Sequence, residues 1–204
     1  MKRIQIITLI LISLFCGNAS AQGRHAGHQG HGEYEERGRP HRPAYFITGN
    51  KVLFDGKVVA GASASSFVIL KDGYAKDTWN VYYEGRKMGN ASSGSFQVLS
   101  YGYAKDTWNV YYNGSKINGA SPGSFSVLGD WYAKDTWNVY YDGKKISDAS
   151  PGSFNVLRGG YAKDTWNVYF DGAKIKGASP GSFKVLGDGY AQDTWDTYYY
   201  GKKV

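Results

Sequence analysis

Cysteine and histidine are nearly missing from this chain: it has one cysteine, Cys16, and all four histidines lie within the first 41 residues. A single thiol cannot form a disulfide within the chain, so the fold must depend on packing and hydrogen bonding. Catalysis needs unlike reactive groups in a fixed mutual geometry. After residue 41 the sequence has no thiol, no imidazole and no glycine-rich phosphate loop that opens a helix. We therefore expect a protein that is not an enzyme and uses no cofactor.

Long apolar runs are also missing, except at the N-terminus. Two basic residues precede an apolar stretch at 4–15, and small residues at 19 and 21 precede Gln22. This order is typical of a secretory signal peptide, and the stretch is shorter than the roughly 20 residues that span a bilayer. We expect residues 1–21 to be removed, Cys16 with them, and the mature protein to be exported to the periplasm, the cell surface or the medium without being an integral membrane protein. The alternatives are a retained anchor and a lipoprotein, although the bulky Phe15 disfavours lipoprotein processing.

Aliphatic residues are scarce from 22 to 44, where Gly, His, Arg and Glu predominate. Such a segment buries too little apolar surface to offset the entropy lost on ordering, so we predict a disordered tail. His25, His28 and His31 have an H-x-x-H-x-x-H spacing that can bind Cu, Ni or Zn weakly. The simpler interpretation is a flexible linker with incidental histidines, because no acidic or cysteine partner completes a zinc site.

The chain carries no block of like charge. Its formal net charge is +7, of which Lys2 and Arg3 contribute two. In the remainder Lys and Asp alternate closely, as in Ala75-Lys76-Asp77. This alternation is typical of a mixed, solvated surface and not of a basic stripe that follows a phosphate backbone, so we expect no nucleic-acid partner.

From Tyr45 onward the sequence repeats every 29 residues. Five full units and a half unit follow one another: residues 45–73, 74–102, 103–131, 132–160, 161–189 and 190–204. Every unit after the first has a tryptophan at the same place: Trp79, Trp108, Trp137, Trp166 and Trp195. A fixed period of this length is the signature of a solenoid, a propeller or another array.

Within a unit the residues predict short strands and tight turns, and no stretch has a convincing helical period. The segments YAKD and NVYYDG are joined by a short tip, and Asn or Asp followed by Gly marks the next hairpin turn. A short KKI segment, a Gly- and Pro-rich break and a last strand, SFxVL, complete the unit. In SFxVL the residue after Phe varies while Phe and Val persist, so Phe and Val should point inward and the variable residue outward. We predict an all-β fold of tandem β-hairpin or meander repeats.

The repeats can form an open array or solenoid, or close into a small propeller-like ring. The end units are atypical: residues 48–51 read TGNK where other units have DTWN, and the last unit has Asp196-Thr197 in place of Asn-Val. Atypical end units cap an open stack, whereas a ring has no ends to cap. We favour the open array and keep the propeller-like closure as the alternative.

One unit shows the whole repeat pattern. It has Asp135, then Val139-Tyr140-Tyr141, then Gly143-Lys144-Lys145-Ile146, and later Phe154. This pattern resembles the DKNYY repeat family of bacterial exported proteins, and it covers nearly the whole chain after the tail. The resemblance implies a bacterial secreted, periplasmic or surface protein and no particular activity. The family's name reflects Lys-Asn after the Asp, where this unit has Thr136-Trp137.

An aspartate opens each tip in all units but the first: Asp77, Asp106, Asp135, Asp164 and Asp193. An Asp at the start of a turn accepts a hydrogen bond from the backbone two residues on, and we expect this structural role. The alternative is Ca²⁺ binding, but the tip lacks the alternating Asp and Asn ligands followed by Gly that mark a calcium loop.

The repeated tryptophans are the candidate ligand-binding residues. They stand in the tip where the first unit has Asn50, and a position that accepts Asn is not deep core, so we expect partial exposure. Aromatic faces at regular spacing suit the apolar faces of sugar rings, with binding that accumulates by avidity. We interpret the chain as a binding module at the bacterial cell envelope, acting on cell-wall or other glycan or on an envelope protein. Two alternatives stay open: each indole folds back onto a neighbouring unit, or the protein is a structural spacer without a ligand. The sequence does not indicate the oligomeric state.

Overall fold

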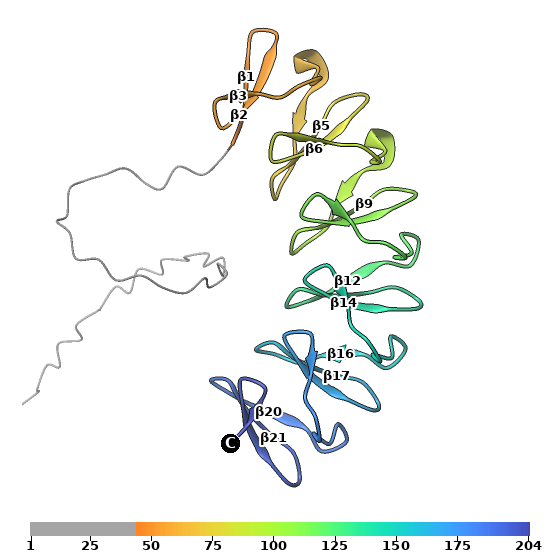
Figure 1. The fold of residues 1–204 in the computed structure, drawn as a ribbon, viewed down its shortest axis with the longest axis vertical. Coiled ribbons are helices and arrows are strands. Elements are labelled where there is room, and N and C mark those ends of the chain that lie inside the picture. Colours follow the sequence, from red (N-terminus) through yellow and green to blue (C-terminus); the bar gives the residue numbers. More distant parts are fainter. Residues whose placement is uncertain (1–43) are drawn as a thin grey trace, which may run out of the picture. The chain divides into compact units, whose positions relative to one another are not determined.

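The computed structural model describes residues 44–204, which are all β. The predicted signal peptide (residues 1–21), nearly all of the predicted tail, and His25, His28 and His31 lie outside the described residues. Residues 44–204 form six small antiparallel sheets that follow one another along the chain (Figure 1) and contain no α-helix. The prediction of an all-β array of tandem repeats is confirmed. In this part of the chain there is also no helix with the length and apolar character needed to cross a membrane.

The strands are short. The first sheet has three: β1 (Tyr45–Thr48), β2 (Lys51–Phe54) and β3 (Lys57–Val58). The second has β4 (Val68–Ile69), β5 (Tyr74–Lys76), β6 (Val81–Tyr83) and β7 (Arg86–Met88). The third has β8 (Gln97–Val98), β9 (Tyr103–Lys105), β10 (Val110–Tyr112) and β11 (Ser115–Lys116). The fourth has β12 (Ser126–Gly129), β13 (Tyr132–Lys134), β14 (Val139–Tyr141) and β15 (Lys144–Lys145). The fifth has β16 (Asn155–Val156), β17 (Tyr161–Lys163), β18 (Val168–Phe170) and β19 (Ala173–Lys174). The sixth has β20 (Lys184–Gly187), β21 (Tyr190–Gln192), β22 (Thr197–Tyr199) and β23 (Lys202–Lys203). Single 3₁₀ turns, η1 (Ala64–Ser66) and η2 (Ser93–Ser95), precede β4 and β8.

The sheets are offset from the repeats of the sequence. Each four-stranded sheet takes its first strand from the SFxVL segment of one repeat and its other three strands from the next repeat. Strand β8, for example, ends one repeat and pairs with β9, which begins the next, through the partners Gln97 and Lys105. Consecutive repeats are therefore joined by backbone hydrogen bonds as well as by side-chain packing.

The hydrophobic core lies between neighbouring sheets. One core cluster combines Tyr103, Val110, Ile117 and Phe125 with Ala133 and Tyr140 of the following sheet, and the same six positions form the other four clusters. The prediction for the SFxVL strand is confirmed for its Phe, which is buried in every copy, and for its variable residue, which is exposed. The Val is half-buried in four copies, and the first copy has Ile69 in its place, 51% exposed. A sheet of three or four short strands cannot bury both of its faces alone, so each unit is stabilised mainly by its neighbours.

The array is open. Each of the five core clusters joins two consecutive sheets, and within residues 44–204 none joins the first sheet to the last. In the two end sheets, some residues are exposed to solvent although their counterparts in inner sheets are buried. Examples are Phe46, which is 55% exposed, and Tyr190, which is 44% exposed. The alternative of a propeller-like closure is therefore wrong.

The first tyrosine of each repeat fastens one sheet to the next. The Tyr132 hydroxyl donates to Gly160 O at 3.0 Å and accepts from Gly172 N at 2.9 Å, and both glycines belong to turns of the following sheet. Gly172 has a φ of +76°, and a Cβ there would lie 2.6 Å from Tyr141 Cβ and 2.7 Å from its ring, so only glycine fits this turn. Equivalent hydroxyl bridges start from four other residues: Tyr45, Tyr74, Tyr103 and Tyr161.

Candidate functional site: the tryptophan tips

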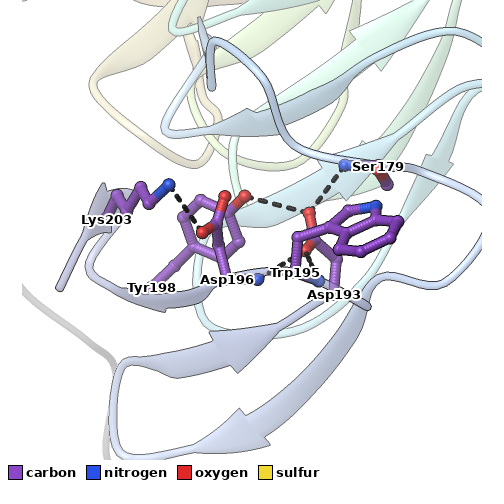
Figure 2. Close-up of polar contacts among 6 residues, drawn as sticks. All are labelled: Ser179, Asp193, Trp195, Asp196, Tyr198 and Lys203. Atoms are coloured by element: carbon purple, nitrogen blue, oxygen red, sulfur yellow. Dashed lines mark hydrogen bonds and ion pairs between the residues drawn. The ribbon is translucent and has the colours of Figure 1, made fainter.

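Each tip between the two central strands of a sheet is organised by one aspartate. In the last unit, Asp193 Oδ1 accepts from Trp195 N and Asp196 N, both at 2.9 Å. Its Oδ2 accepts from Ser179 N at 2.7 Å and from the Tyr198 hydroxyl at 2.9 Å (Figure 2). The bond from Trp195 N is the interaction with the backbone two residues on that the sequence predicted, so the structural role of these aspartates is confirmed.

The same carboxylate network is present in the four preceding tips. Burial by itself would raise the pKa of Asp77, but hydrogen bonds from Ser63 N, Trp79 N, the Tyr82 hydroxyl and Asn80 N outweigh it and lower the pKa to about 2. The pKa values of the other four tip carboxylates are lowered for the same reasons. All five are ionised at neutral pH, with both oxygens engaged by donors of the protein.

Two serines of the segment that precedes each sheet also form hydrogen bonds with the tip. Ser121 N donates to Asp135 Oδ2 at 2.9 Å, and Ser124 Oγ accepts from Thr136 N at 3.1 Å. The pattern of a single repeat indicates no role for these serines. Their recurrence was the available signal, because every repeat has Ser at both places.

The tryptophan side chains project into solvent from these braced tips. Trp79, Trp108, Trp137, Trp166 and Trp195 are between 73% and 80% exposed. The expectation of exposure is confirmed, and the alternative in which each indole folds back onto its neighbour is wrong. A sixth tryptophan, Trp131, lies outside the tips, is half-buried and packs edge-on against Tyr101 with the ring centroids 5.4 Å apart.

The tip of the first unit is built differently. Residues 48–51 form a hairpin of the same length, but Gly49 adopts a left-handed φ of +56°, and no Asp opens the turn. Asn50 therefore lies on a tip of different construction, and it is not a valid comparison for the tryptophans. The exposure of the indoles does not depend on that comparison, because it is observed directly.

The chemistry available at the tips is that of binding surfaces. The indoles offer flat apolar faces, while the tip carboxylates already accept hydrogen bonds on both oxygens. Within residues 44–204, no group of three or more His, Cys, Asp or Glu side chains is arranged to hold a metal ion. Every unit after the first thus presents one exposed indole on an equivalent tip.

Comparison with known proteins identifies the repeats. Residues 39–114 and 103–204 match the sequence model of the DKNYY family. No curated protein and no solved structure matches the chain.

Proposed function

The chain belongs to the DKNYY family, and from its row of exposed indoles we propose that it is a non-enzymatic binding module that holds a linear glycan at the bacterial cell envelope. The N-terminal pattern of basic, apolar and small residues supports export. The matched repeats support a multivalent surface, because every unit after the first offers the same indole on the same tip.

The observation that carries this proposal is the exposure of large apolar rings on ordered tips. An indole that is about three-quarters exposed, such as Trp137 at 75%, contributes little to folding. The tip that carries it is nevertheless held by four hydrogen bonds that Asp135 accepts, three from backbone N–H groups and one from the Tyr140 hydroxyl. A ring on a fixed tip loses little conformational freedom when it stacks on a ligand, and such preorganisation favours affinity.

A glycan suits these tips better than a compact ligand. Sugar rings have apolar faces that stack on aromatic side chains, and a polymer offers many equivalent rings to sites that repeat along the chain. If each stacked indole contributes about 1 kcal/mol, losing three of five weakens binding by about 3 kcal/mol, which is roughly a hundredfold or more.

The proposal is tested with the variant Trp108→Asn/Trp137→Asn/Trp166→Asn. We expect an unchanged far-UV circular dichroism spectrum and loss of binding to a panel of cell-wall and soluble glycans. The matched control is Thr107→Asn/Thr136→Asn/Thr165→Asn, which changes the exposed residue before each indole and keeps the rings.

The alternative is a spacer without a ligand, which the uniform interfaces between sheets also support. A spacer predicts that neither variant changes any property of the protein and that the parent chain binds no glycan. If the tryptophan variant unfolds, the indoles are structural and the binding proposal is refuted.

A further inference from the structure

The outer edge strands carry a second regular column of side chains. The second residue of each edge strand is a lysine in five consecutive sheets: Lys87, Lys116, Lys145, Lys174 and Lys203. All five are exposed. We call this set the lysine column.

The lysine column lies beside the tryptophan tips. In the last unit, Lys203 Nζ is 2.6 Å from Asp196 Oδ1, and Asp196 directly follows Trp195 (Figure 2). The other units pair the same two strands in the same register, for example Tyr140 with Lys145. The register therefore places every lysine of the column opposite the tyrosine three residues after its own indole, the position from which Lys203 reaches Asp196.

Only the last lysine of the column is neutralised. The residue that follows the indole is Asn in the four inner tips and Asp only at position 196. Among the described residues, Lys87, Lys116, Lys145 and Lys174 make no ion pair. Four tips thus combine an indole with a lysine that makes no ion pair, while the one ionised carboxylate of each tip is engaged by donors of the protein.

The first unit lacks both side chains together. It has Asn50 in place of the tip tryptophan and Val58 in place of the lysine. The two columns therefore begin at the same unit, which is consistent with their acting on one ligand.

Acidic residues other than the hydrogen-bonded tip carboxylates lie mostly at the opposite end of each sheet. Apart from the five tip carboxylates, residues 44–204 contain nine acidic residues, and seven of them stand in the turns at the end away from the tips: Asp55, Asp72, Glu84, Asp130, Asp142, Asp171 and Asp188. A surface that combines positive charge with apolar rings complements a ligand that has negative charge and sugar faces.

We propose that the ligand is an anionic polysaccharide, whose rings stack on the tip indoles while its carboxylate or other acidic groups pair with the lysine column. This inference rests on the proposed glycan-binding function and specifies its ligand class. A nucleic acid or an acidic polypeptide is not what we propose, since neither offers the regular apolar sugar faces.

The test compares acidic polysaccharides with their uncharged forms. Binding of the full chain to polygalacturonate, alginate and hyaluronate is measured by isothermal titration calorimetry alongside the methyl ester of each polymer. We expect the acids to bind and the esters to bind at least tenfold more weakly, with the difference disappearing at high salt. The variant Lys116→Gln/Lys145→Gln/Lys174→Gln should weaken binding of the acids about tenfold and leave the esters unaffected.

A matched control removes three lysine charges from the opposite end of the edge strands. Lys57→Gln/Lys144→Gln/Lys202→Gln changes the first residue of three edge strands, beside the acidic turns, and should leave binding unchanged. If acids and esters bind equally and both depend on the tryptophans, the anionic class is wrong while the glycan-binding function stands. Equal binding of poly-glutamate or single-stranded DNA overturns the inference in favour of a general polyanion site. Failure of all six polysaccharides to bind overturns the inference as well, whereas the glycan-binding function falls only if the panel of cell-wall and soluble glycans also shows no binding.

Discussion

The hydroxyl bridge between sheets can be tested by deleting one oxygen atom. In Tyr132→Phe the ring stays in the core, while Gly172 N loses the acceptor that lies 2.9 Å away. Gly160 O loses the Tyr132 hydroxyl but keeps a hydrogen bond from Asp171 N at 3.0 Å. The variant therefore leaves one half-buried amide donor without a partner, which costs about 1 to 3 kcal/mol. We expect the free energy of unfolding to fall by about 2 kcal/mol.

Tyr190→Phe is the matched control for this prediction. Tyr190 occupies the same place in its repeat, but no sheet follows it among residues 44–204, and its ring is 44% exposed. Its hydroxyl has no bridge to lose, so the variant should change stability by less than about 0.5 kcal/mol.

Urea unfolding at neutral pH, followed by far-UV circular dichroism, measures both variants. Arrays of repeats do not always unfold in one step, so the denaturation midpoints and slopes are compared along with the free energies. Equal destabilisation by the two substitutions, or none by either, would show that the hydroxyl bridge does not fasten the sheets.

Two further predictions follow from the tips and the tyrosines. The pKa of Asp77 lies at about 2, below its ordinary 3.8, so its contribution of about 2 kcal/mol to the free energy of unfolding is present above pH 4 and lost as the pH falls toward 2. Burial raises the pKa of Tyr103 from 10.0 to about 12. The contribution of Tyr103 to the free energy of unfolding is therefore present below pH 10 and lost as the pH rises toward 12. Unfolding midpoints measured across the pH scale should therefore show a plateau that falls at both ends, and a midpoint that keeps rising below pH 4 would contradict the carboxylate network. Because the tip indoles are exposed beside the lysine column, tryptophan emission should resemble that of indole in water, and iodide should quench it more strongly than caesium. Lys116→Gln/Lys145→Gln/Lys174→Gln should reduce that preference, and equal quenching by the two ions in the parent chain would contradict a basic tip surface.

The sequence predicted those features that depend on a single repeat. The alternation around Phe125 and the turn opened by Asp135 follow from local rules of strand and turn geometry, and both are present in the structure. Contacts between repeats were harder to predict, because identical copies offer several equivalent ways to pair. The sequence did not show that β8 pairs with the next repeat, nor that the Tyr132 hydroxyl reaches two glycines 28 and 40 residues away. The contact of Lys203 with Asp196, the residue after Trp195, likewise depends on strand register, which the order of residues alone does not show.

The near-identity of the interfaces between sheets has a consequence for how such genes change. The segments that begin at Tyr103 and Tyr132 share the same ten residues, so recombination between them removes or adds one 29-residue unit. The newly joined sheets would meet through the same six core positions and the same hydroxyl bridge as their predecessors. Copy number can therefore drift without an intermediate that fails to fold. Each step changes the number of indole-bearing tips by one, which gives natural selection a graded series of chain lengths on which to act.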